Sequence, residues 1–157
     1  MFTPMSSETS STSLRILVVD DDCDIRDSMA TVLRMYGFDV GEAASGTEAL
    51  EALKQRAHEV ALVDVSMSGM DGYELAVEVT HLLAETRPVL IALTGWGREE
   101  DRSRAAACGF DHFFVKPVPG ETLRTLLEGL RTTATAHRDV RTVKTGSSPS
   151  VAIAASQ

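Results

Sequence analysis

The amino-acid sequence predicts an α/β fold in which one parallel sheet carries helices on both faces. Short apolar runs alternate with segments of helical periodicity five times along residues 14–130. The first, third and fourth apolar runs are apolar almost throughout, which is typical of strands covered on both sides. Strands and helices that alternate in this way form parallel sheets joined by right-handed crossovers.

Five strands are expected from the apolar runs. Each run is short and is followed by turn residues or a helical pattern, which favours a strand over a buried helix. The expected strands are residues 14–19, 38–42, 60–64, 89–94 and 112–115.

The segments between and after these runs each predict a helix. Four of them have one apolar stripe, as a helix that covers a sheet should, whereas residues 98–108 form a shorter and more polar segment. The stripes consist of Ile25, Met29, Val32, Leu33 and Tyr36 in the first helix, Leu50 and Leu53 in the second, Leu75, Val79, Leu82 and Leu83 in the third, and Leu123, Leu126, Leu127 and Leu130 in the last.

Local signals mark the helix ends. Ser45 and Glu48 have the spacing of a capping box at the start of the second helix. Gly37 and Gly109 stand where the first and fourth helices should end. Pro119 is well placed to begin the fifth helix.

The length of 157 residues suits one domain with a real core. We expect a domain over residues 14–131, a disordered N-terminal tail over residues 1–13 and a flexible C-terminal tail over residues 132–157. Both tails are polar and lack a periodic apolar face. After Leu130 the sequence offers too few residues for a DNA-binding domain, so no effector domain is expected.

Composition points to a cytoplasmic protein. The N-terminus lacks a basic, apolar signal sequence, and no apolar run approaches the roughly 20 residues of a membrane span, so no membrane insertion is expected. The two cysteines are too few for a disulfide framework. Residues 14–130 carry 21 acidic and 11 basic side chains, a balance that argues against direct DNA binding. An acidic body suits a cation or a basic partner instead.

Polar side chains gather where four of the expected strands end. Asp20, Asp21 and Asp22 follow the first strand, Asp64 ends the third, Thr94 ends the fourth, and Lys116 follows the fifth. Each has an ordinary structural explanation, such as a helix cap for Asp22 or a solvated lysine for Lys116. Ligands of open parallel sheets bind at this edge, however, so the combination indicates a functional site.

The chemistry of this set fits phosphoryl transfer. Carboxylates held close together repel each other and favour a hard cation with oxygen ligands, such as Mg²⁺. Such a cation would cancel charge between Asp64 and an incoming phosphoryl group, while Thr94 and Lys116 would meet its oxygens. The sequence therefore predicts a magnesium-assisted phosphoryl acceptor, with Mn²⁺ as a possible substitute for Mg²⁺.

Five segments, in order along residues 14–130, resemble the receiver domain of two-component response regulators. They are residues 16–22 (ILVVDDD), 61–64 (ALVD), 69–74 (GMDGYE), 91–95 (IALTG) and 114–117 (FVKP). The resemblance implies a flavodoxin-like (CheY-like) doubly wound five-stranded parallel sheet with strand order 2-1-3-4-5. It also implies a cis peptide bond between Lys116 and Pro117.

The resemblance assigns roles position by position. Asp64 corresponds to the phosphoacceptor, and the metal ligands correspond to Asp20, Asp21, Asp64 and the backbone carbonyl of Ser66. Thr94 and Phe113 correspond to the switch residues, and Lys116 to the phosphoryl-binding lysine. The implied phosphodonor is a sensor histidine kinase or a histidine phosphotransfer protein. The implied downstream partner would dock on the face formed by the fourth helix, fifth strand and fifth helix, where the arginines are Arg98, Arg102, Arg104 and Arg124.

Four positions depart from the common receiver pattern. Phe113 often corresponds to Tyr, and Ser68 lies where many members have Pro. Asp22 adds a third acid that serves either as a cap or as local charge. Trp96 is bulky at a position that can overlook the phosphoryl group, although a loop or partner contact is an equal alternative.

Other function classes fit less well. A phosphatase with an aspartyl nucleophile would place that residue after the first strand, and a flavodoxin would need a Ser/Thr-rich phosphate loop there. We therefore expect no enzyme beyond a protein that catalyses its own phosphorylation and dephosphorylation. The remaining alternative is a receiver-fold adaptor or hybrid-kinase module whose output is docking rather than phosphorylation.

Overall fold

A computed structural model describes the backbone of residues 13–146 and the side chains of residues 13–133. One parallel sheet has the strand order β2-β1-β3-β4-β5. Its strands are β1 (Arg15–Val19), β2 (Asp39–Ala43), β3 (Val60–Asp64), β4 (Val89–Thr94) and β5 (His112–Val115). This order confirms the predicted flavodoxin-like, doubly wound topology.

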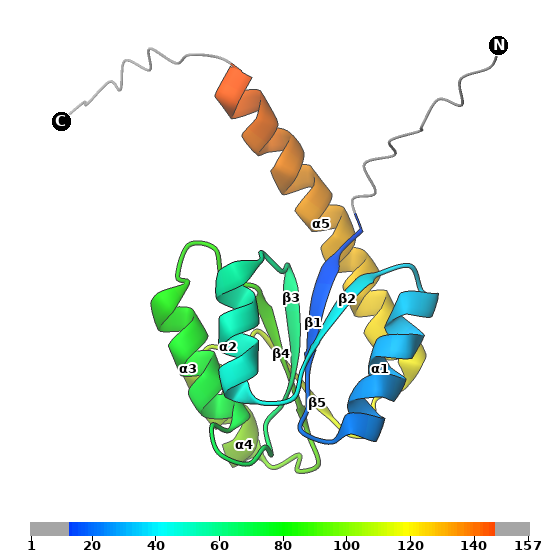
Figure 1. The fold of residues 1–157 in the computed structure, drawn as a ribbon, viewed down its shortest axis with the longest axis vertical. Coiled ribbons are helices and arrows are strands. Elements are labelled where there is room, and N and C mark those ends of the chain that lie inside the picture. Colours follow the sequence, from blue (N-terminus) through cyan, green and yellow to red (C-terminus); the bar gives the residue numbers. More distant parts are fainter. Residues whose placement is uncertain (1–12, 147–157) are drawn as a thin grey trace.

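Five helices alternate with the strands and cover both faces of the sheet (Figure 1). They are α1 (Cys23–Met35), α2 (Gly46–Gln55), α3 (Gly72–Leu82), α4 (Glu99–Cys108) and α5 (Gly120–Gly146). Helices α1 and α5 pack on one face, and α2, α3 and α4 pack on the other.

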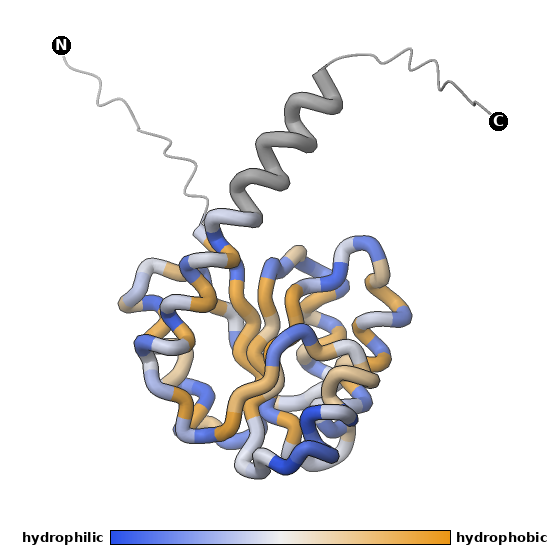
Figure 2. The backbone as a smooth tube through the Cα atoms, turned by 180° about the vertical axis from the view of Figure 1, so that it is seen from behind, coloured by the Kyte–Doolittle hydropathy of each residue, from blue (hydrophilic) through white to orange (hydrophobic). Residues whose placement is uncertain are grey.

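Two apolar clusters fill the space between the sheet and its helices. Leu33 of α1 and Leu127 of α5 are fully buried against one face, and Leu75 and Val79 of α3 against the other. Every residue of β3 is buried, as expected for a central strand. Figure 2 shows the corresponding hydrophobic colouring along the central strands.

The predicted helix signals are largely confirmed. Gly37, which follows the C-cap residue of α1, and Gly109, which is the C-cap of α4, have positive φ angles of 89° and 112°. Ser45 Oγ accepts from the Glu48 N–H at 3.1 Å, but the Glu48 carboxylate accepts from the N–H of Ala44 rather than from that of Ser45. The second hydrogen bond of the capping box therefore involves the residue before the N-cap rather than the N-cap residue itself.

The C-terminal boundary differs from the expected one. Helix α5 continues through residues 132–146, where a flexible tail was expected after residue 131. The apolar stripe ends at Leu130, but residues 132–145 contain neither Pro nor Gly, so no backbone signal ends the helix before Gly146. The rest of the expected C-terminal tail, residues 147–157, and residues 1–12 of the N-terminal tail lie outside the described residues.

Among the helices of the described region, none has the length and apolar character needed to cross a membrane.

Candidate functional site

The sheet brings the predicted polar residues to one edge. Asp20 follows β1, Asp64 ends β3, Thr94 ends β4, and Lys116 follows β5. Asp20, Asp64 and Thr94 are the buried polar residues of the described side chains, with 4%, 7% and 1% of their surfaces exposed. Burying carboxylates is costly unless partners compensate, so their surroundings decide what the site can do.

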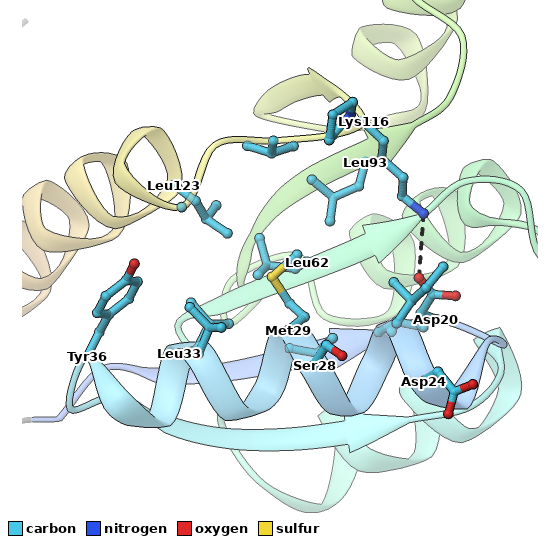
Figure 3. A pocket seen from close by; sticks show the side chains of 17 residues that line it. Asp20, Asp24, Ser28, Met29, Leu33, Tyr36, Leu62, Leu93, Lys116 and Leu123 are labelled. Atoms are coloured by element: carbon cyan, nitrogen blue, oxygen red, sulfur yellow. Dashed lines mark ion pairs between the residues drawn. The ribbon is translucent and has the colours of Figure 1, made fainter.

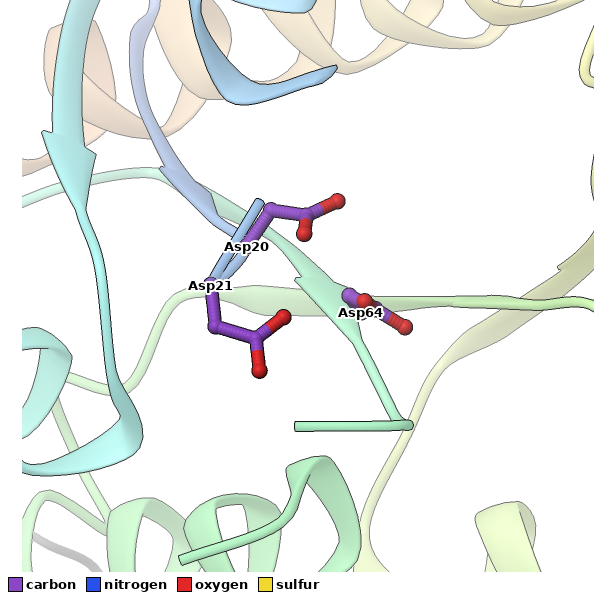
Figure 4. A group of neighbouring side chains, drawn as sticks. All are labelled: Asp20, Asp21 and Asp64. Carbon is purple, nitrogen blue, oxygen red and sulfur yellow. The ribbon is translucent and has the colours of Figure 1, made fainter. Parts of the chain in front are cut away.

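Three carboxylates converge at this edge (Figure 4). An oxygen from each of Asp20, Asp21 and Asp64 lies within 4.8 Å of the others. Asp21 is exposed, so the cluster is accessible from solvent on one side. Three carboxylates at this spacing match the oxygen ligands that a Mg²⁺ ion takes in proteins.

Backbone N–H groups orient each of these carboxylates. Asp20 Oδ1 accepts from the N–H of Asp22 at 2.9 Å, and Asp64 Oδ1 accepts from the N–H of Ser66 at 3.0 Å. Asp21 Oδ2 accepts from the N–H of Ser68 at 3.1 Å, which joins the loops after β1 and β3. Each acid therefore has one oxygen engaged by the fold.

Lys116 is the basic side chain of the cluster. Its Nζ lies 3.5 Å from Asp20 Oδ2 and 3.6 Å from Asp64 Oδ2. Burial raises the pKa of the Asp20 carboxyl above its ordinary value, and the Asp64 charge acts in the same direction, while the Asp22 N–H and Lys116 oppose it. The positive charge of Lys116 thus does not fully offset the negative charges of the three carboxylates. Binding of a cation between them is therefore favoured.

Thr94 lies at the end of β4, beside β3 and β5 in the sheet. Its hydroxyl oxygen accepts from the N–H of Trp96 at 3.1 Å, and its carbonyl accepts from the N–H of Lys116 at 2.7 Å. The loop after β4 and the start of the segment after β5 are therefore tied to this residue. The Lys116–Pro117 peptide bond is cis, as the resemblance implied.

The two aromatic residues near this edge contact arginines of the α4 region. The Arg102 guanidinium lies 5.0 Å from the centroid of the half-buried Phe113 ring. The Arg98 guanidinium lies 5.5 Å from the Trp96 ring, which is 62% exposed. The contact between Arg102 and Phe113 joins α4 to β5 and had no signal in the sequence, whereas Arg98 and Trp96 are two residues apart in the loop before α4.

The other two arginines assigned to a partner face also stack on rings. Arg104 lies 4.1 Å from the centroid of Tyr73, at the start of α3, and Arg124 of α5 lies 5.0 Å from that of Tyr36. Arg104 therefore contacts α3 rather than β5. All four arginines remain exposed, so stacking leaves each one accessible to a partner.

Two residues acquire structural roles near the site. Asp22 is the N-cap of α1, and its Oδ1 accepts from the N–H groups of Asp24 and Ile25 at 3.0 and 3.1 Å. Gly72 begins α3, and a Cβ there would lie 2.6 Å from Val65 Cα and 2.9 Å from the Asp64 carbonyl oxygen. The loop after Asp64 therefore packs directly against the start of α3.

The family comparison identifies the chain. A family model described as the response regulator receiver domain matches residues 16–128. The chain belongs to the response regulator receiver domain family. The match covers β2 to β5, all of β1 except Arg15, and the edge that carries the acid cluster. This receiver domain is thus part of the two-component signalling class, as the sequence predicted.

Curated proteins of similar sequence include the following two. A Leptolyngbya boryana protein, described only as an uncharacterized 14.6 kDa protein in the sodA1 3′ region, is 44% identical over 111 residues, covering 69% of this chain and 84% of that protein. The transcriptional regulatory protein PrrA of Mycobacterium tuberculosis is 34% identical over 141 residues, covering 87% of this chain. This chain spans only 59% of the length of that regulator.

Solved structures show the same fold. The chemotaxis protein CheY4 of Vibrio cholerae matches with a TM-score of 0.70 and 30% identity, over 75% of this chain and 98% of that one. A CheY-like receiver domain protein of Methanospirillum hungatei matches with a TM-score of 0.70 and 30% identity, over 79% and 98% of the two chains. Receiver domains generally bind Mg²⁺ through an acidic pocket, and this one holds an aspartate cluster that fits such an ion.

Proposed function

We propose that this receiver domain accepts a phosphoryl group from a phosphohistidine donor onto Asp64 and thereby changes the surface formed by α4, β5 and α5. The observation that carries the proposal is the setting of Asp64. Its carboxylate is buried beside Asp20 and Asp21, with the Lys116 ammonium 3.6 Å away. A sensor histidine kinase or a histidine phosphotransfer protein would be the donor.

The transfer forms one bond and breaks one. An oxygen of the Asp64 carboxylate bonds to phosphorus, the N–P bond of the phosphohistidine breaks, and the imidazole leaves with its electron pair and takes up a proton. The product on this chain is an acyl phosphate. In such reactions the protein contributes mainly by positioning groups and stabilising charge.

The residues of the site have separate tasks in this proposal. Asp20, Asp21, Asp64 and the Ser66 carbonyl would hold Mg²⁺, or Mn²⁺ in its place, and the bound cation would offset negative charge on the carboxylates and phosphoryl oxygens. Lys116 would pair with a phosphoryl oxygen. The Thr94 hydroxyl can donate to another, since in the structure it accepts from the Trp96 N–H and its proton has no partner among the described side chains.

The switch would begin at Thr94. Movement of its hydroxyl toward the phosphoryl group would open space beneath it, into which Phe113 can turn. Such two-state switches require only a few kcal/mol of differential interaction to reverse their populations. The partner would read the change on α4, β5 and α5, where the exposed arginines suit an acidic surface.

The test is the intact mass of the full chain after incubation with acetyl phosphate or phosphoramidate and Mg²⁺. The parent should gain one phosphoryl group, and Asp64→Asn should gain none. Asp22→Asn is the matched control, because Asn also caps helices well and the site is otherwise unchanged. Mn²⁺ in place of Mg²⁺ should also support labelling.

Equal labelling of Asp64→Asn and the parent would reject Asp64 as the acceptor. A folded parent that gains no mass from either donor would instead favour the docking module without phosphorylation. Direct DNA contact is not part of the proposal, because acids outnumber bases by 21 to 11 in residues 14–130.

A further inference from the structure

A groove of about 680 Å³ lies between α1 and the segment that follows β5 (Figure 3). Its wall is mainly apolar and comes from α1, from the strands beneath it and from the start of α5. The apolar lining includes Met29, Val32, Leu33, Leu62, Leu93 and Leu123. Ligand sites in proteins have this size range and this predominantly apolar lining.

The α1 side of the groove leaves apolar surface uncovered. Ile25, Met29, Val32 and Tyr36 recur at helical spacing along α1 and all line the groove. Ile25 is 45% exposed and Val32 is 39% exposed, although both belong to the stripe that faces the protein body. A ligand seated in the groove would remove this surface from water, which is favourable in proportion to the apolar area covered.

One end of the groove is polar and acidic. Asp20, Asp24 and Lys116 line it, and Ser28 lies farther along α1, beside Met29 (Figure 3). The Lys116 ammonium is shared between Asp20 and Asp64, at 3.5 and 3.6 Å. Asp24 is exposed and, among the described side chains, forms no ion pair; its Oδ1 accepts a hydrogen bond from the Cys23 thiol at 3.9 Å. In Figure 3 the Asp24 carboxylate points away from the apolar lining, so this end of the groove carries a carboxylate without an ion pair at its rim rather than within the apolar channel.

We propose that this groove binds a small amphiphile with an ammonium head and an apolar body. The ammonium would pair with Asp24, and the body would lie along Met29 and Val32, opposite Leu123. Asp24 and Tyr36 are about 18 Å apart along α1 at 1.5 Å per residue, which leaves room for a chain of about eight carbons or more. An anionic head would find one ammonium there, that of Lys116, which already pairs with Asp20 and Asp64, and it would be repelled by Asp20 and Asp24.

Occupancy would place a ligand directly beside the phosphorylation site, because Asp20 and Lys116 line the groove as well as the acid cluster. The proposal goes beyond phosphoryl transfer and does not depend on it. It is therefore tested on the unphosphorylated full chain without a divalent cation.

The experiment compares octylamine, octan-1-ol and octanoate, which share one chain and differ in head charge. Each is titrated into the full chain while methyl chemical shifts of Val32, Val118 and Leu123 are followed. Octylamine should bind tightest and octanoate weakest. The amine should bind about two- to fivefold more tightly than the alcohol, which is the range of an exposed ion pair.

Matched variants on α1 distinguish the contribution of the ligand's head group to binding from that of its apolar chain. Asp24→Asn should remove the advantage of the amine over the alcohol, whereas Asp27→Asn, an exposed acid outside the groove, should keep it. Ser28→Trp should fill the groove and weaken all three probes, whereas Thr31→Trp, exposed and outside the groove, should not. Thermal unfolding of each variant establishes that it is folded.

Three results would overturn the proposal. Tighter binding of octanoate than of octylamine would make the groove an anion site. If Ser28→Trp does not alter the chemical-shift changes caused by the probes, the probes bind outside the groove. Self-association of the parent that Ser28→Trp abolishes, without saturable binding of any probe, would assign the groove to a second copy of the chain.

Discussion

The guanidinium of Arg102 on α4 lies 5.0 Å from the centroid of the Phe113 ring on β5. Helix α4 begins with a charged run, ends in three alanines and Cys108, and has Ala105 as its one buried residue. Stacked arginines therefore form a substantial part of what connects α4 to the sheet and to α3. A ring that turns inward during switching must leave the Arg102 guanidinium behind.

Removing this contact should make the switch easier. Arg102→Ala should raise the affinity for a beryllofluoride phosphoryl mimic by about two- to fivefold, because an exposed cation–π contact contributes about 0.5–1 kcal/mol. Arg104→Ala, which removes the stack on Tyr73, is the matched control and should leave that affinity unchanged. Equal effects of the two substitutions would show that α4 stability, rather than Phe113, controls the switch.

Substitutions of the adjacent residues Asp21 and Asp22 should have different effects, the first on Mg²⁺ binding and the second on helix capping. Asp21→Ala should weaken Mg²⁺ binding sharply with little loss of stability, since it removes an exposed carboxylate of the cluster. Asp22→Ala should cost about 0.5–2 kcal/mol of unfolding free energy and change Mg²⁺ affinity little, because it removes the α1 cap. Metal titration and urea unfolding of both variants check this. An unchanged Mg²⁺ affinity for Asp21→Ala would reject the ligand set.

Substitution by alanine should change the stability of the fold in opposite directions at two glycines. Gly72→Ala should destabilise the fold by about 1–3 kcal/mol and reduce labelling of Asp64, since its Cβ would press on Val65 Cα and the Asp64 carbonyl. Gly129→Ala, in α5, meets no atom within 4 Å and should stabilise the fold by about 0.5–1 kcal/mol. Denaturant unfolding measures the stability of both variants. If Gly72→Ala is as stable as the parent, the loop after β3 can move to make room for the added Cβ.

A pH dependence is expected from His58. Burial lowers the pKa of the ring below its ordinary value of 6.5, and the Arg56 and Arg15 charges act in the same direction, while the hydrogen bond to the Arg56 backbone and the Asp39 charge oppose it only in part. As pH falls through 6.5, the unfolded chain takes up the proton first, so this contribution to stability is present above 6.5 and is lost below it.

Thermal unfolding at about pH 7.5 and about pH 5.5 tests this expectation. The parent should lose more stability between the two conditions than His58→Gln does. His81→Gln, at an exposed position of α3, is the control and should behave like the parent. An equal loss in the parent and in His58→Gln would exclude His58 as the source.

The sequence by itself determined the order of the elements and the residues at the strand ends. The bounds of β3, β4 and β5 agree with the prediction, because uninterrupted apolar runs leave little choice of register. The start of β1 and both ends of β2 lie one residue later than predicted, and the ladder between the two strands pairs Arg15 with Asp39. Asp20, Asp21, Asp64, Thr94 and Lys116 were identifiable because parallel strands bring their carboxyl ends to one edge.

Only the tertiary structure decided how side chains from separate elements meet. The Ser68 N–H bond to Asp21, the stacking of Arg102 on Phe113 and the groove between α1 and α5 join residues far apart in the chain. Their spacing depends on side-chain direction and helix packing, which periodicity does not encode. The length of α5 was also missed, because an apolar stripe reports where a helix packs and not where its backbone hydrogen bonds end.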